Sequence, residues 1–422
     1  MMDIKTIATT IVTAIFLLIV LSYYYLLLFK RKKIPASRKK YSSITIIIPA
    51  HNEERYIAQT LESVLAADFK GKKEIIMIDD GSQDKTYQVA KQIADKHSGK
   101  IKILRTKHRG KSKSINKALS IAKGELIAVV DGDSVIHKNA LIEAIKLIKP
   151  KHVGAVCSIV KVKNRNKFIG IWLHMEQLYN SLLRGLFSKV NVNIVAPGPL
   201  SVYKKKVLQE LKGFETKGFS EDVDIAVRLI KAGYKVECAE KSVSETNMPI
   251  DIRGFTRQRT RFSRGWINIL KRHLRLNHTF MQIYTLPLAF FWYLQAIIMG
   301  SITIYNLVSG YIQYFVSQGT WLSLGVLRFF FEWLSIIGII RWFISIISGV
   351  NPLTIGAVIG LSASLLVYPL YLMAIIKYDR KLTFGHIIAL LFMFPFWLVI
   401  MIFYIINIKE VFVKHQRNIW EK

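Results

Sequence analysis

The chain has 422 residues, of which 51% are hydrophobic, and its formal net charge at pH 7 is +32. This length is sufficient for two or three domains. The apolar and the basic residues are segregated along the chain, so local segments are more informative than these averages. The two cysteines, Cys157 and Cys238, are isolated in the sequence, which indicates no disulfide framework, and their spacing is not that of a metal site.

Residues 6–29 contain no charged side chain. As a helix they would extend roughly 36 Å, enough to cross a hydrocarbon core of about 30 Å. A cleaved signal peptide is the competing interpretation, but its apolar region would be only about 7–15 residues long and would precede a small-residue cleavage site. Residues 30–40, KRKKIPASRKK, contain seven basic residues and no acidic one. This predicts an uncleaved anchor, with the chain after Lys40 in the cytosol.

From residue 41 to about residue 278, apolar β-branched runs alternate with segments of helical periodicity. The strand-like runs are ITIIIPA (44–50), KEIIMIDDGS (73–82), KIKILRT (100–106) and ELIAVVDGDS (125–134). Strands buried on both faces of a sheet have this uninterrupted apolar character. The alternation therefore predicts an α/β fold with a mainly parallel sheet and right-handed crossovers.

Three of these strands end in polar or acidic residues. These residues are His51, Asn52 and Glu53 after the first strand, Asp79 and Asp80 after the second, and Asp131 and Asp133 after the fourth. Ligands of parallel sheets bind beyond the carboxyl ends of the strands, so we expect a site there. Carboxylates attract a phosphate group only through a divalent cation, and Mg²⁺ and Mn²⁺ prefer oxygen ligands. Asp131 and Asp133 therefore predict a site for Mg²⁺ or Mn²⁺.

Two common phosphate-binding motifs are absent from the sequence. There is no G-x-x-x-x-G-K-[ST], and no G-x-G-x-x-G follows the first strand. These absences argue against a P-loop NTPase and an ordinary dinucleotide oxidoreductase.

Six segments, in order, resemble motifs of the family 2 glycosyltransferases, which have a GT-A fold. IIIPAHNEE, IMIDDGSQDKT, GKSKSINKAL and VVDGDS resemble the nucleotide-sugar-binding half, and FSEDVDIAVRLIKAGYKV resembles the Glu-Asp acceptor-site motif. RQRTRFSRGW resembles the Q-x-x-R-W motif of membrane-bound members, such as poly-N-acetylglucosamine, hyaluronan, chitin and cellulose synthases. The matches extend from about residue 44 to residue 266.

The resemblance implies a UDP-sugar donor and assigns roles to matched positions. The implied donor-binding residues are Ala50, Glu53, Asp79, Asp80, Lys111 and Asp131, and the implied metal ligands are Asp131 and Asp133. In this assignment Asp79 or Asp80 faces the nucleobase, and Lys111 approaches the diphosphate. A solvated lysine in a basic stretch is the alternative for Lys111.

Glycosyl transfer requires a general base, because the acceptor hydroxyl loses a proton as it attacks. SEDVDIAVRLIKAG predicts a helix that begins near Glu221 and Asp222 and ends at Gly233. We expect Asp222 to be the catalytic base, with Glu221 beside it in the catalytic pair. The alternatives are a purely structural role for acids at a helix start and, less favoured as the base, Asp224.

Residues 257–276, RQRTRFSRGWINILKRHLRL, form a basic amphipathic segment that predicts a helix at a membrane surface. The resemblance assigns the acceptor and the leaving diphosphate to Gln258 and Arg261, with Arg259 and Phe262 beside them. The final Trp of the motif is Phe262 here, and Trp266 lies four residues later without an aligned role. The acceptor and the processivity therefore stay open.

Four long apolar segments follow: 281–308, 321–347, 352–376 and 387–408. The second contains Arg328, Glu332 and Arg341, which require partners in an apolar setting, and Arg328 and Glu332 are spaced to pair. With the anchor, these segments predict five crossings. The positive connector KYDRK favours the alternative in which the second segment does not cross.

The predicted organisation is an anchor and basic segment (1–40), a cytosolic GT-A domain (41–250), an interfacial segment (251–280), a transmembrane region (281–408) and a tail (409–422). The predicted activity is that of a multi-pass, inverting hexosyltransferase of the cell membrane, which transfers a sugar such as N-acetylglucosamine from a UDP-sugar to a growing polysaccharide. The alternative is one transfer to a lipid acceptor. The expected partners are the donor, a carbohydrate or lipid acceptor and membrane lipids. A basic scaffold or nucleic-acid binder is disfavoured, because the acidic residues gather at strand ends.

Overall fold

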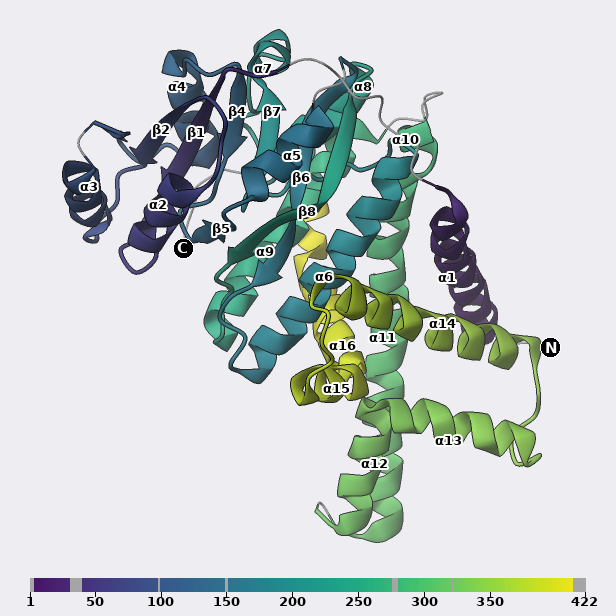
Figure 1. Cartoon of the computed structure of the whole chain (residues 1–422). Helices are drawn as coiled ribbons and strands as arrows, with labels where there is room; N and C mark the ends of the chain where they lie inside the picture. The colour runs from purple at the N-terminus through teal and green to yellow at the C-terminus, as the bar shows by residue number, and fades with distance from the viewer. Residues whose placement is uncertain are drawn as a thin grey trace. The chain divides into compact units, whose positions relative to one another are not determined.

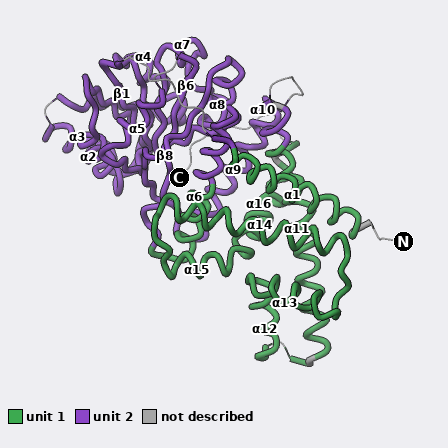
Figure 2. The backbone as a smooth tube through the Cα atoms, turned by 45° about the vertical axis from the view of Figure 1, so that its right-hand side comes forward, with its two compact units in different colours: residues 1–28, 166–179, 288–412 green, residues 29–165, 180–287, 413–422 purple. Residues whose placement is uncertain are grey.

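The computed structural model describes residues 4–30, 40–97, 99–148, 151–274, 280–320 and 322–412. Most of the basic segment 30–40 and of the tail 409–422 lies outside these residues. The chain forms two compact units (Figure 2). We call them the sheet unit, with the described parts of 29–165 and 180–287, and the helical unit, with those of 1–28, 166–179 and 288–412.

The sheet unit contains one eight-stranded sheet in the order β3-β2-β1-β4-β7-β6-β8-β5 (Figure 1). The strands are β1 (Ser43–Ala50), β2 (Lys72–Asp79), β3 (Ile101–Arg105), β4 (Leu126–Val129), β5 (Ser134–Ile136), β6 (Val153–Val162), β7 (Ser201–Lys204) and β8 (Lys235–Thr246). Strands β1 to β4 are the four predicted strands, and they pair in parallel. Strand β7 runs antiparallel to both β4 and β6, and β5 runs antiparallel to β8, so the sheet is mixed.

Helices cover both faces of this sheet. They are α2 (Ile57–Ala66), α3 (Thr86–Lys96), α4 (Lys111–Ile121), α5 (Ala140–Ile148), α7 (Lys205–Glu210), α8 (Glu221–Lys231), α9 (Ile252–His273) and the short α10 (Phe280–Ile283). Ile47 of β1 packs in one core with α4, α7 and α8, whereas Ile46 and Ile48 pack in a second core with α2, α3 and α5. Successive side chains of a strand point to opposite faces, which explains why residues 46–50 of β1 are all apolar and buried.

Helix α9 corresponds to the predicted interfacial segment and belongs to the sheet unit. Its N-cap is Asp251, whose carboxylate accepts a hydrogen bond from Gly254 N at 2.8 Å. Ile269 and Trp266 pack against the core of α4 and α8. At least part of the apolar face predicted to meet a membrane is therefore buried within the sheet unit.

The helical unit is built from apolar helices of different lengths. They are α1 (Ile4–Leu28), the first part of α6 (Phe168–Lys189), most of α11 (Thr285–Gln318), α12 (Leu324–Leu334), α13 (Ile336–Ile347), α14 (Ile355–Tyr378), α15 (Phe384–Leu391) and α16 (Met393–Ile406), followed by a 3₁₀ turn (Asn407–Val411). Among the described residues, α1, α11 and α14 are long and apolar enough to cross a membrane. The pairs α12–α13 and α15–α16 are bent by 91° and 58°, and counting each pair as one span would give five. Five crossings therefore stay a prediction.

The charges predicted to need partners in the second apolar segment are paired with one another. Arg328 Nε lies 2.8 Å from Glu332 Oε1, which confirms the predicted pair on α12. Arg341 of α13 contacts the same carboxylate. The Glu332 carboxylate thus forms ion pairs with one arginine of its own helix and one arginine beyond the bend.

Candidate active site

The carboxyl ends of β1, β2 and β4 meet at one edge of the sheet. Ala50, the last residue of β1, is paired with Asp79, the last residue of β2. The backbone of Asp80 donates to Ala50 O at 2.9 Å, and Val130 N donates to Ile47 O at 3.0 Å. Because the three strands are parallel neighbours, the acidic residues that follow β2 and β4 lie on either side of β1. The expected convergence of these strand ends is confirmed.

Lys111, the first residue of α4, lies between two carboxylates. Its Nζ is 2.6 Å from Asp131 Oδ1 and 2.6 Å from Glu221 Oε1, and its side chain is only 16% exposed. Burial by itself would lower the pKa of Lys111, but the two carboxylates outweigh this effect and raise the pKa well above its usual value. Lys111 is therefore a paired cation that joins the end of β4 to the start of α8, and the alternative of a solvated lysine is wrong.

Two carboxyl groups of the site have raised pKa values. Burial, and next the charge of Asp131, raises the pKa of Asp133 to about 6. Burial, and next the charge of Glu221, raises the pKa of Asp222 to about 6. Glu221 differs: burial would raise its pKa, but the charge of Lys111 lowers it. Neighbouring carboxyl groups with pKa values pushed apart are typical of acid–base sites.

Asp79 and Asp80 are fully buried and already have partners within the protein. The Asp79 carboxylate lies 3.0 Å from Arg105 Nε. The Asp80 carboxylate accepts hydrogen bonds from Gly110 N at 2.9 Å and from Ser114 Oγ at 2.7 Å. Asp80 therefore organises the start of α4, the helix that begins with Lys111. Contact of either carboxylate with a nucleobase stays a prediction.

Ala50 and Glu53 lie against the turn between Asp131 and Asp133. A β-carbon added at Gly132 would be 3.1 Å from Ala50 Cβ and 3.2 Å from Glu53 Cγ. Glu53 is only 3% exposed. The structure thus brings both predicted donor-binding residues to the turn that carries the predicted metal ligands, and their contact with a donor stays a prediction.

The predicted acceptor and diphosphate residues lie on the first half of α9. Gln258 Nε2 donates to Met248 Sδ at 3.0 Å. Arg259 is 7% exposed, and its guanidinium carbon lies 5.8 Å from the centre of the Phe262 ring. The positive charge of Arg261 favours the ionised forms of both Asp133 and Glu221. Arg261 is therefore close enough to the carboxylates to act on them electrostatically.

Gly198 is a site residue that sequence analysis missed. Its carbonyl accepts a hydrogen bond from Asp131 N at 3.1 Å, and a β-carbon at position 198 would overlap the Asp131 carboxylate. Only glycine leaves room for that carboxylate. The flanking Pro197 and Pro199 were the available signal, because Pro-Gly-Pro marks a tight turn.

A second polar cluster lies in the helical unit. His174 Nε2 of α6 is 2.7 Å from Asp379 Oδ2, which follows α14, and His386 Nε2 of α15 is 3.5 Å from the same oxygen. These three residues are close enough to be considered as metal ligands. However, Thr383 N donates to His386 Nδ1 at 3.1 Å, which leaves the ring proton on Nε2, facing Asp379. Hydrogen bonding to the carboxylate therefore explains this cluster without a metal.

Residues 45–212 match the family described as Glycosyl transferase family 2. This match and the sheet topology define the class: the chain carries a glycosyl transferase family 2 domain with a GT-A-like mixed α/β fold. A solved structure that covers the chain almost completely has the same fold. It is the mannosyltransferase PcManGT from Pyrobaculum calidifontis in complex with GDP-Man and Mn²⁺, with a TM-score of 0.62, 18% identity, and coverage of 98% of this chain and 99% of that one.

Two kinds of curated relative resemble the sequence. The probable glycosyltransferase YdaM of Bacillus subtilis is 27% identical over 235 residues, which is 54% of this chain and 56% of the relative. The poly-beta-1,6-N-acetyl-D-glucosamine synthase of Staphylococcus epidermidis is 25% identical over 244 residues, which is 57% of this chain and 58% of the relative. The matches thus span little more than half the length of these relatives.

Proposed function

We propose that this chain is a membrane-embedded, inverting glycosyltransferase that transfers a sugar from a UDP-sugar to a growing polysaccharide. The observation that carries the proposal is the position of Lys111, 2.6 Å from Asp131 and 2.6 Å from Glu221. It joins the proposed donor side of the site, after β4, to the proposed acceptor side, at the start of α8. The names of the staphylococcal relatives make N-acetylglucosamine the first sugar to test.

Asp131 and Asp133 are the residues that would hold Mg²⁺ or Mn²⁺. They offer oxygen ligands of the kind that both cations prefer. After burial, the charge of Asp131 is the main cause of the raised pKa of Asp133, so a cation beside both carboxylates would relieve a real repulsion. When bound there, it would neutralise negative charge that develops on the leaving diphosphate.

In the proposed reaction Asp222 receives the proton of the acceptor hydroxyl. The hydroxyl oxygen forms a bond to the anomeric carbon while the bond from that carbon to the diphosphate oxygen breaks. The electron pair of the broken bond leaves with the diphosphate, and the direct displacement inverts the anomeric configuration. A base with a pKa of about 6 is mostly ionised at pH 7 and still accepts a proton readily.

Two cations are proposed to receive the leaving diphosphate. Lys111 supplies an ammonium group and Arg261 a guanidinium group, and charge-assisted hydrogen bonds to phosphate oxygens are stronger than neutral ones. Glu221 keeps its charge because Lys111 lowers its pKa against the effect of burial. We assign Glu221 the role of holding Lys111 toward the acceptor side before the donor binds.

Membrane embedding is proposed from α1, α11 and α14, with the sheet unit on the cytosolic side of the cell membrane. A second candidate function is a single transfer to a lipid acceptor. It is favoured by Phe262, which stands where the motif of polymerising relatives has Trp and is 36% exposed. A smaller aromatic face retains a sugar chain less firmly.

The test is turnover by detergent-solubilised protein with radiolabelled donors, each with Mg²⁺ and with Mn²⁺. The donors are a panel of UDP-sugars and GDP-mannose, which the solved mannosyltransferase binds. Products too large to enter a sizing gel support the polysaccharide, and small products that extract into organic solvent support the lipid acceptor. If no donor is consumed and UDP does not bind with either metal, the proposal is wrong.

A further inference from the structure

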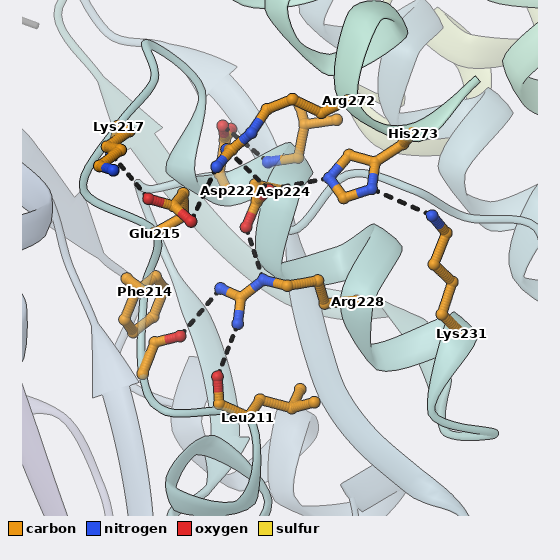
Figure 3. Close-up of polar contacts among 12 residues, drawn as sticks. Leu211, Phe214, Glu215, Lys217, Asp222, Asp224, Arg228, Lys231, Arg272 and His273 are labelled. Atoms are coloured by element: carbon orange, nitrogen blue, oxygen red, sulfur yellow. Dashed lines mark hydrogen bonds and ion pairs between the residues drawn. The ribbon is translucent and has the colours of Figure 1, made fainter. Parts of the chain in front are cut away.

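A third acidic residue of α8, Asp224, lies among two arginines and a histidine (Figure 3). Its Oδ2 accepts a hydrogen bond from Arg228 Nε at 2.6 Å. Its Oδ1 lies 2.9 Å from His273 Nε2 and 3.3 Å from Arg272 Nη1, at the end of α9. Asp224 is only 3% exposed. Both carboxylate oxygens are thus occupied: Oδ2 by an arginine of α8 itself, and Oδ1 by two residues that tie α8 to α9.

Arg228 and Arg272 extend these contacts to the loop that precedes α8. Arg228 donates to the carbonyls of Leu211 and Gly213, at 2.8 Å each. Arg272 Nη2 lies 2.8 Å from Glu215 Oε2. Figure 3 shows both arginines directed from Asp224 toward this loop.

The same loop is tied to α4, the helix that begins with Lys111. Asn116 Nδ2 donates to Phe214 O at 2.7 Å, and Asn116 Oδ1 accepts from Phe214 N at 2.8 Å. One side chain of α4 therefore satisfies both backbone groups of a loop residue. The contacts run without interruption from α4 through the loop and α8 to the end of α9.

We propose that these residues form a bracket that holds the three helices carrying Lys111, Asp222 and Arg261 in register, and that Asp224 is the positioning residue at its centre. This inference rests on the proposed function, in which these helices supply the cations and the base. Misplacement of a reacting group by about 1 Å can cost roughly a hundredfold in rate.

The electrostatics of Asp224 suit this role. Burial would raise its pKa, but the hydrogen bond from His273 and the charge of Arg228 lower it. Asp224 therefore stays ionised at neutral pH and keeps all three contacts. A base needs an oxygen that reaches the acceptor, and both oxygens of Asp224 face partners within the bracket. This favours positioning over the alternative in which Asp224 is itself the base.

The test compares Asp224→Asn with the wild-type protein in detergent. We expect kcat to fall by about tenfold or more, with the Kd for the donor changed by less than about twofold, because the bracket acts on the geometry of transfer. In an Asp222→Asn background, Asp224→Asn should reduce the remaining rate by a smaller factor than it reduces the wild-type rate, because the part of its effect that passes through Asp222 is already lost. Two results would overturn the proposal. One is an unchanged kcat in Asp224→Asn, and the other is a rate loss in the double variant equal to the product of the losses in the two single variants.

Asp251→Ala is the matched control, because it removes the N-cap of α9 but lies outside the bracket. It should lower Tm without the loss of kcat. If Asp224→Asn does not fold, Arg272→Gln removes one contact to Asp224 and should lower kcat by about threefold or more.

Hydrogen exchange of the backbone amides supplies a readout that needs no activity. Asp224→Asn should speed exchange in residues 213–224 more than in β1. An equal effect of the substitution on the two segments would contradict the bracket. If the wild-type protein transfers no sugar, the proposed function fails while this measurement still tests the bracket.

Discussion

Glu221 and Asp222 are adjacent in the chain, yet their carboxyl groups have opposite pKa shifts. Burial raises the pKa of each, but Lys111 lies 2.6 Å from Glu221 and lowers its pKa, whereas the charge of Glu221 raises the pKa of Asp222 further. The residue with a neighbouring cation holds a permanent charge. The residue beside it is suited to take up a proton near neutral pH.

The first prediction is that kcat rises with pH through about 6, because protonated Asp222 cannot accept the hydroxyl proton. Asp222→Asn should abolish most transfer while leaving the donor Kd nearly unchanged. A comparable loss of donor affinity in calorimetry would make Asp222 a donor-site or structural residue.

The raised pKa of Asp222 also affects the stability of the folded protein. The pKa of Asp222 is higher in the folded protein than in the unfolded chain, so ionised Asp222 costs free energy of folding at pH values above about 6. Asp222→Asn should therefore raise Tm by a few degrees, roughly, at pH 7.5. The gain should shrink as the pH falls below about 6 and should disappear below about pH 3, where Asp222 is protonated in both states. Scanning fluorimetry at both pH values measures this.

The second prediction concerns the metal. Asp133→Asn removes one of two carboxylates proposed to hold the cation, so the activity of this variant should be lower by roughly a hundredfold or more. The wild-type protein should lose its activity in excess EDTA. Restoration by Mn²⁺ or Mg²⁺ after EDTA removal is the control. Undiminished turnover in EDTA would refute the metal assignment.

The third prediction concerns Phe262, which is 36% exposed and lies beside Arg259 and Arg261. Phe has a smaller aromatic face than Trp and no N–H group, so it should hold an acceptor sugar less firmly. Phe262→Trp should lengthen the products if the enzyme polymerises, and Phe262→Ala should impair acceptor use more than donor binding. If neither changes product length or rate, Phe262 is only a packing residue of α9.

At the scale of elements, the position of α9 against the start of α8 depends on a small residue. A β-carbon at Gly265 would overlap Ser220 Oγ, and Ser220 is the N-cap residue that immediately precedes Glu221. The side chain of Ser220 makes no capping hydrogen bond. Its hydroxyl can therefore be removed at little cost to α8.

The fourth prediction uses this contact. Gly265→Ala should push Ser220 aside, lower stability by about 1–3 kcal/mol through overpacking, and lower kcat by displacing Asp222. Ser220→Ala alone should be nearly neutral. The double variant should recover part of both losses, because the overlapping hydroxyl is gone. Equal damage in the single and double variants would show that the contact with Ser220 is not the cause.

At the scale of the whole molecule, the helical unit carries charges within an apolar segment. Glu332 Oε1 accepts a hydrogen bond from Arg328 Nε at 2.8 Å. The same carboxylate contacts Arg341 across the 91° bend between α12 and α13. Unpaired charges in an apolar environment are costly, so this carboxylate is expected to stabilise the bent pair.

The fifth prediction is that Glu332→Gln lowers Tm in detergent by a few degrees, roughly, because two arginines lose their counter-charge. Glu332→Asp, which keeps the charge, should lose less. The membrane fraction should retain the wild-type protein after an alkaline carbonate wash, as expected of a protein with spanning helices. Equal Tm values for the wild type and Glu332→Gln would show that the pairing does not stabilise the unit.

The amino-acid sequence alone was sufficient for the local features of this protein. Strands β1 to β4 were visible as apolar runs, and the polar or acidic ends of β1, β2 and β4 could be read directly, because parallel neighbours bring such ends to one edge. The start of α8 at Glu221 and the pair Arg328–Glu332 follow from helical spacing. These features depend on residues close together in the chain.

Tertiary structure decided the features that depend on distant residues. Strands β5 to β8 complete a mixed sheet that was not predicted, because their pairings join segments far apart in sequence. The charge states of Asp133, Asp222 and Lys111 depend on burial and on neighbours from other elements. Spacing along the chain carries no information on either quantity, since both arise only when β4, α4 and α8 pack at one edge of the sheet.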